Sequence, residues 1–234
     1  MEKLSLFLLV APMLLFSMVA HEYAHGYAAL KQGDDTAQSL GRLTWNPLKH
    51  LDFWMTLVMP IVTFAATGGR IIFGGAKPVP VNPSKYRNYR RGDIIVSLAG
   101  VATNMVLAVV LVPVVIGLGV LARAVPFLAD SVSLVQIMLL YGIIINLVLA
   151  AFNLIPIPPL DGSHVLKHFL PMRAAIAYQR FGRYGLIIVF VMLSFGRPVL
   201  NAWMAPVFFL NDLAMGLAAP YVDLGRWASL LGGA

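Results

Sequence analysis

The stretch that decides the fold of this chain is "LSLFLLVAPMLLFSMVAHEYAHGYAAL", residues 4–30. It is apolar and long enough to cross the roughly 30 Å hydrocarbon layer of a bilayer as a helix. Its second half nevertheless places His21, Glu22 and His25 among apolar residues. Ionisable groups at membrane depth cost free energy and usually mark a functional site. The stretch therefore predicts a transmembrane helix that carries chemistry.

The composition extends this prediction to the whole chain. Hydrophobic residues make up 59% and charged residues only 12%, with a mean hydropathy of +0.82, whereas soluble domains carry about 25% charge. We therefore expect an integral membrane protein that forms one membrane-embedded domain over residues 1–234. The net charge is +7, but no basic groove with interleaved aromatic residues is present, so no nucleic acid partner is expected. Basic residues of this kind usually lie in cytoplasmic loops.

The apolar runs predict an all-α polytopic membrane protein with about five to six transmembrane helices. Clear spans follow at 94–121 and 133–155. We expect further helices within 174–219, although 184–196 alone is short, and 199–219 could span, re-enter or lie at the interface. The run 52–67 is also short and has Pro60 near its centre. We interpret it as a short re-entrant or β-like segment between the first and second clear spans.

The distribution of Lys and Arg favours that interpretation. If 52–67 returns to the face it came from, 14 of the 17 Lys and Arg residues lie on one face. If it crosses instead, only 12 do. Because cytoplasmic loops carry the excess of basic residues, the first arrangement predicts an outside N-terminus. It also places the ends of the first helix and of 133–155 on the cytoplasmic side.

His21, Glu22 and His25 form the pattern His-Glu-x-x-His. On a helix, residues four apart lie on one face, so both imidazoles can bind one zinc ion. The carboxylate of Glu22 can then take a proton from water at the metal without being a ligand. The alternative is an interfacial histidine pair at a helix end, which the apolar surroundings disfavour.

A third ligand must come from elsewhere, because catalytic zinc sites usually have three protein ligands and one open position. The best candidate is Asp161 in "NLIPIPPLDG", residues 153–162. The three prolines end the preceding helix and force an extended path toward the carboxylate. The same residues also suit an ordinary turn, so this motif alone does not decide between a metal-binding segment and a turn.

Taken in order, these motifs resemble the site-2 protease family of intramembrane zinc metalloproteases. The resemblance rests on His-Glu-x-x-His, on "SLAGVATN" at 97–104 and on "NLIPIPPLDG", and it covers about residues 15–170. In addition, "GGAKPVPVNP" at 74–83 is similar to a segment of small prokaryotic members without PDZ or CBS domains. One difference is Val101, where the family often has proline.

The resemblance implies one Zn²⁺ ion bound by His21, His25 and Asp161, with Glu22 as the general base. It also implies that Asn153 holds the substrate or the developing oxyanion. The expected activity is hydrolysis of peptide bonds in or near transmembrane segments of membrane proteins. We expect a prokaryotic plasma-membrane protein with its active site toward the cytoplasm, whose partners are its substrates and the bilayer. Nothing in the sequence indicates an oligomeric state.

Two other functions fit part of the pattern. A metal-binding membrane transporter would explain buried His and Asp but does not need a glutamate beside His21. A catalytically inactive membrane scaffold would not need Glu22 at all. The pair His164 and His168 could form a second metal site, but solvated histidines are the favoured interpretation. Asn104 and Asn146 are interpreted as hydrogen-bonding residues between helices.

Overall fold

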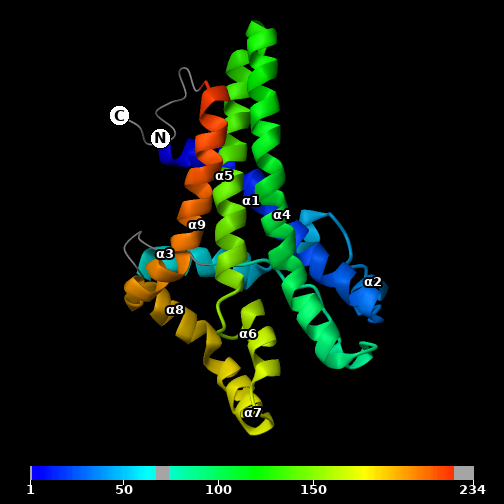
Figure 1. Ribbon diagram of the computed structural model, residues 1–234. Helices are drawn as coiled ribbons and strands as arrows, with labels where there is room; N and C mark the ends of the chain where they lie inside the picture. The colour runs from blue at the N-terminus through cyan, green and yellow to red at the C-terminus, as the bar shows by residue number, and fades with distance from the viewer. Residues whose placement is uncertain (1, 67–73, 224–234) are drawn as a thin grey trace. The chain divides into compact units, whose positions relative to one another are not determined.

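The computed structural model describes residues 2–66 and 74–223, and within these residues all regular structure is helical. The prediction of an all-α protein is confirmed. Figure 1 shows the helices in chain order. Their bounds are α1 Glu2–Gln32, α2 Thr36–Ser39, α3 Met59–Ala66, α4 Tyr89–Ala124, α5 Ala129–Asn153, α6 Asp161–Leu166, α7 Met172–Phe181, α8 Gly185–Phe195 and α9 Arg197–Ala218.

Five helical segments in the described part of the chain are long and apolar enough to cross a membrane. Their positions agree with the predicted spans. The first three correspond to α1, α4 and α5. The fourth begins at Met172, so α7 adds the length that the short apolar run 184–196 lacks by itself. The five segments are Ser5–Gln32, Tyr89–Ala124, Pro126–Asn153, Met172–Phe195 and Arg197–Tyr221.

The segment between the first two spans is a short helix. A π-helical turn, Phe53–Val58, leads into α3, and Asp52 caps it by accepting hydrogen bonds from the backbone N–H groups of Trp54 and Met55. Helix from Phe53 to Ala66 is about 21 Å long at 1.5 Å per residue, shorter than the roughly 30 Å layer. Residues 74–82 form no regular secondary structure and pair with no strand in the described chain. The β-like alternative is thus not observed there, and Thr67 to Phe73 lie outside the described residues.

The chain's contacts divide it into two compact units. The first unit comprises Met1–Ser17, Asn104–Leu149 and Ala205–Ala234. Its centre is a buried polar network in which Asn104 Nδ2 donates to Asn146 Oδ1 at 2.7 Å and Asn146 Nδ2 donates to Ser17 Oγ at 2.8 Å. All three side chains are fully buried. The interpretation of both asparagines as interhelical contacts is confirmed.

The second unit comprises Met18–Thr103 and Ala150–Met204. Hydrogen bonds from side chains to backbone carbonyls join its segments: Trp203 Nε1 of α9 donates to Ala151 O of α5 at 2.8 Å, and Tyr178 Oη of α7 donates to Pro156 O of the proline-rich turn at 2.9 Å. A small apolar core forms around Ala29, Tyr86 and Val96. Every candidate site residue predicted from the sequence falls in this unit.

Candidate metal centre

Helix α1 brings two imidazoles together one turn apart. His21 Nε2 and His25 Nε2 lie 3.0 Å from each other, with the rings edge to face. His21 is 7% exposed, so its ring is removed from solvent. The four-residue spacing on a helix produces this arrangement directly, because residues i and i+4 share a face.

The third predicted ligand joins them from a segment far away in sequence. Asp161 is the first residue of α6, and its Oδ2 lies 3.2 Å from His21 Nε2 and 3.4 Å from His25 Nε2. The preceding residues fold back tightly, since Leu160 N–H donates to Ile157 O at 2.9 Å. Gly162 then passes so close to the Leu154 carbonyl that a Cβ would collide with it. The proline-rich segment therefore ends in a fixed position for the carboxylate.

The spacing of the three candidate ligand atoms matches the requirements of a zinc ion. Zinc bound at about 2.0–2.2 Å in tetrahedral geometry separates neighbouring ligand atoms by about 3.3 Å, and the three separations here are 3.0, 3.2 and 3.4 Å. Asp161 Oδ2 is buried without a hydrogen-bond donor of suitable geometry. A buried carboxylate oxygen is costly unless a cation or a donor compensates it. Among the described residues, this is the one group of three His, Asp or Glu residues that could hold a metal.

Helix α4 fixes the imidazoles from the other side. His25 Nδ1 donates to the carbonyl of Val96 at 2.7 Å. A carbonyl can only accept, so the proton sits on Nδ1 and the lone pair on Nε2 faces the other ligands, as is usual for metal-binding histidines. One turn further along, a Cβ at Gly100 would lie 2.5 Å from His21 Cε1 and 2.6 Å from His25 Nε2. Only glycine leaves room for both rings.

Sequence reasoning did not assign roles at the centre to Val96 and Gly100. Gly100 was part of the motif "SLAGVATN", which carried the resemblance without a stated contact. Val96 contributes a backbone carbonyl, and no side-chain pattern can reveal such a group. A signal for Gly100 did exist, because glycine inside a helix is unfavourable and is often retained for close packing.

Glu22 lies beside the ligand triangle but does not belong to it. Its Oε2 accepts a hydrogen bond from the backbone N–H of Val79 at 2.7 Å. Val79 belongs to the segment 74–82, which hydrogen bonds also attach elsewhere: Lys77 N–H donates to His50 O at 2.7 Å and Asn82 N–H to Asp34 Oδ2 at 2.5 Å. This segment thus holds the Glu22 carboxylate in place.

A second cluster of ionisable groups lies on the helical turns that follow Asp161. Asp93 of α4 is 3% exposed, and its Oδ2 lies 2.7 Å from Lys167 Nζ and 2.6 Å from His168 Nε2. The prediction that both histidines are solvated is wrong for His168, because its side chain is only 8% exposed and pairs with the Asp93 carboxylate. His164 is 48% exposed in its side chain. Burial, followed by the nearby Lys167 ammonium, lowers the pKa of His164.

This cluster is an ion-pair network in the described structure. Lys167 Nζ lies 3.3 Å from His164 Nδ1, and an ammonium group at that position would repel a second metal cation. Asn153 ends α5 and is half-buried beside the proline-rich turn. The structure therefore places it at the start of the segment that leads to Asp161.

Comparisons with known proteins agree with this centre. The family described as "Peptidase family M50" matches residues 9–196. The chain is 36% identical to "Putative zinc metalloprotease YwhC" of Bacillus subtilis over 182 residues, 76% of this chain and 77% of the relative.

Mycobacterial relatives are similar over more of the chain. "Putative zinc metalloprotease Rip2" of Mycolicibacterium smegmatis is 34% identical over 203 residues, 87% of this chain and 72% of the relative. The protein of the same name from Mycobacterium tuberculosis is 31% identical over 236 residues, 96% of this chain and 82% of the relative. No solved structure matches the chain.

Proposed function

Because the chain belongs to peptidase family M50 and is a zinc metalloprotease of the membrane, we propose that it hydrolyses peptide bonds in or next to transmembrane segments of membrane proteins. The observation that carries this proposal is the position of the donor set. His21 and His25 lie in the second half of an apolar helix, Ser5–Gln32, that is long enough to span a bilayer. A protease with its metal ligands at that depth acts on substrates that are themselves in the membrane.

The proposed ligands are His21, His25 and Asp161, whose buried oxygen and two imidazole nitrogens suit zinc. When bound, the zinc ion supplies Lewis acidity that makes water a nucleophile near neutral pH and polarises a peptide carbonyl. Val96 keeps the His25 ring in the tautomer that presents Nε2. Gly100 keeps the space around both rings free of side-chain atoms.

The proposed general base is Glu22. Its carboxylate accepts the proton of the attacking water and later passes that proton to the leaving amine, so one residue serves both steps. The hydrogen bond from the Val79 N–H orients this carboxylate while leaving its second oxygen to the reaction. We assign Asn153 to the substrate carbonyl, either holding it or donating to the developing oxyanion.

A helical substrate must unwind before its carbonyls can react, because they are engaged in the i to i−4 ladder. We propose that segment 74–82, whose prolines favour an extended path, receives the unwound substrate by strand addition. Val79 of this segment already touches Glu22. A substrate helix with helix-breaking residues at the cleavage point should be cut faster than a poly-leucine helix, and equal rates would remove this step.

We place the active site toward the cytoplasm. The counts of Lys and Arg favour a cytoplasmic position for residues 31–93 and 154–183. His21 follows about 17 residues of helix from Leu4, roughly 26 Å along the axis, and so lies near the face at which α1 ends.

One experiment tests the proposed function against its rivals. The chain contains two glutamates, Glu2 and Glu22. Glu22→Gln should keep zinc but lose cleavage of reconstituted membrane-protein substrates by about 10²–10⁴-fold, while Glu2→Gln serves as the matched control and should cleave normally. Zinc bound without any Glu22-dependent cleavage would favour a metal transporter or an inactive scaffold.

A further inference from the structure

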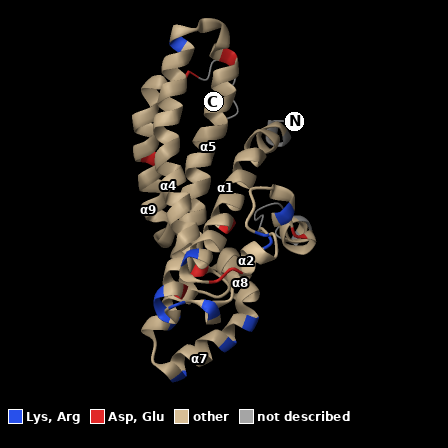
Figure 2. Ribbon diagram, turned by 90° about the vertical axis from the view of Figure 1, so that its right-hand side faces the viewer, with Lys and Arg blue, Asp and Glu red and all other residues tan. Residues whose placement is uncertain are grey.

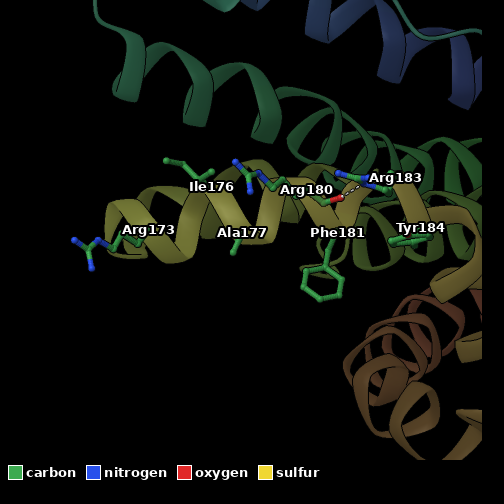
Figure 3. A pocket seen from close by; sticks show the side chains of 7 residues that line it. All are labelled: Arg173, Ile176, Ala177, Arg180, Phe181, Arg183 and Tyr184. Carbon is green, nitrogen blue, oxygen red and sulfur yellow. Dashed lines mark hydrogen bonds between the residues drawn. The ribbon is translucent and has the colours of Figure 1, made fainter.

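Three arginines gather along α7 and the turn that follows it. Arg173, Arg180 and Arg183 fall within an arc of about 80° when successive residues are placed 100° apart on a helix. Together with Ile176, Ala177, Phe181 and Tyr184 they line a shallow pocket of about 300 Å³ on the helix surface. Figure 3 shows Arg180 and Arg183 pointing to the same side as Ile176, while Arg173 extends beyond the start of the helix and Phe181 points to the opposite side. The three side chains are exposed.

Among the described residues, no ion pair joins a carboxylate to this basic face. The sequence contains no Asp or Glu between Asp161 and Asp212. Within the described residues, the ion pairs of the second unit's carboxylates involve other cations, such as Lys167 with Asp93 and Lys85 with Asp35. Arg183 instead donates from Nε to the Arg180 carbonyl at 3.2 Å. Figure 2 shows the same imbalance, with basic residues and no acidic residue along α7.

The position of this face in the sequence sets its depth in the membrane. The apolar helix α8 begins at Gly185, so Arg183 lies within one turn of it. Arg173 lies 12 residues before Gly185, about 18 Å along a helix. Met172 is 77% exposed and Phe181 61% exposed, and such apolar side chains beside a basic face are typical of helices at the lipid interface. An α7 helix that lies along the interface, parallel to the membrane surface, keeps all three arginines at the level of the phospholipid headgroups, while α8 enters the bilayer.

We propose that Arg173, Arg180 and Arg183 form a binding site for the phosphate headgroups of anionic phospholipids. The guanidinium fork matches phosphate oxygens in a bidentate manner. The 154–183 face is the one that the Lys and Arg counts assign to the cytoplasm, and the leaflet there carries negative surface charge. Each basic residue at such a surface raises the affinity for anionic lipid roughly fivefold. This site is separate from the metal centre and does not depend on the proposed cleavage reaction.

The test is lipid competition on the purified, full-length, zinc-loaded protein. Detergent-solubilised protein is mixed with equal amounts of phosphatidylglycerol and phosphatidylcholine, and native mass spectrometry counts the lipids of each kind that stay bound. We expect a preference for phosphatidylglycerol of at least about tenfold. The variant Arg173→Gln/Arg180→Gln/Arg183→Gln should lose it, and the corresponding Arg→Lys variant should keep only part, because lysine retains the charge without the fork.

The matched control is Arg87→Gln/Arg90→Gln/Arg91→Gln, which removes three exposed arginines from the start of α4 and the loop before it. It should retain the preference. An equal loss in the control, or an unchanged preference in the α7 variant, would overturn the proposal. The proposal would also be overturned if an acidic peptide displaced the bound lipid while the protein showed no preference for phosphatidylglycerol. The site would then bind a protein. Zinc content and gel filtration show whether the triple variant folds. If it does not, each of the three single Arg→Gln variants should lower the preference for phosphatidylglycerol by about fivefold or less.

Discussion

The four ionisable residues at the metal centre should respond differently to removal, because three are proposed ligands and one is not. His21→Ala, His25→Ala and Asp161→Ala each leave two donors, so we expect the zinc content of the purified protein to fall well below one per chain. Glu22→Gln should keep its zinc, since the Glu22 carboxylate hydrogen-bonds to Val79 and lies outside the ligand group. Metal analysis of the four purified variants checks this prediction. If Asp161→Ala kept full zinc and activity, the third ligand would be another residue, and His164 would be the first to replace.

At the same scale, the sequence predicted side chains well and backbone partners poorly. His21, Glu22 and His25 follow from spacing on one helix, and Asp161 from a proline-rich turn at the end of another. The contacts of Val79 N–H and Val96 C=O lie 57 and 71 residues away from their partners. Every residue carries these backbone groups, so no pattern of letters selects the two that matter. The ion-pair cluster around Asp93 was not predicted for a related reason. In the sequence Asp93 is a single polar residue near a helix start, and its partners Lys167 and His168 are distant.

At the scale of helices, α4 is the element that sets the geometry of the centre. Gly100→Ala would place a Cβ 2.5 Å from the His21 ring and 2.6 Å from His25 Nε2, and real Cβ atoms do not approach so closely. We expect this variant to lose zinc and cleavage while the protein remains membrane-inserted. Gly117→Ala is the matched control on the same helix, because nothing lies within 4 Å of a Cβ there. It should match the wild type, and retention of zinc by both variants would contradict the proposed packing.

The same helix also anchors α6 through Asp93. Asp93→Asn leaves the ammonium of Lys167, which is 8% exposed, without its carboxylate. Removing one partner of a buried ion pair typically costs about 3–5 kcal/mol, and His168 loses its acceptor at the same time. We expect a lower thermal unfolding midpoint and weaker zinc retention, because α6 begins at the proposed ligand Asp161.

Two further variants distinguish this effect from a general loss of charge. Asp35→Asn removes the exposed partner of Lys85 and should change neither quantity, since exposed pairs contribute little. Asp93→Asn combined with Lys167→Met removes both charges and should recover part of the lost stability. If the double variant were as unstable as Asp93→Asn, the unpaired ammonium would not be the cause.

At the scale of the whole chain, helix number and position followed from composition. The five spans needed only length and apolar character, because the bilayer imposes both. The sequence could not decide whether residues 52–67 form helix or extended chain, since Pro60 and a run of this length allow either. In the structure these residues are helical from Phe53 to Ala66, and Asp52 caps the helix. Whether the protein forms a single domain, as the sequence suggested, stays a prediction.

The path of that short segment decides the topology and can be tested directly. We predict that it returns to the face it came from, because this places 14 rather than 12 of the 17 Lys and Arg residues on the cytoplasmic side. The chain has no cysteine, so Ser39→Cys, Ser84→Cys and Ser131→Cys can each be labelled without background, and all three positions are exposed. An impermeant thiol reagent added to intact cells should label the cysteine at position 131 and neither of the others, while permeabilised cells should label all three. If the cysteine at 39 reacted from outside and that at 84 did not, the segment would cross the membrane, α1 would run in the opposite direction, and the end of α1 that carries the proposed ligands would face the outside.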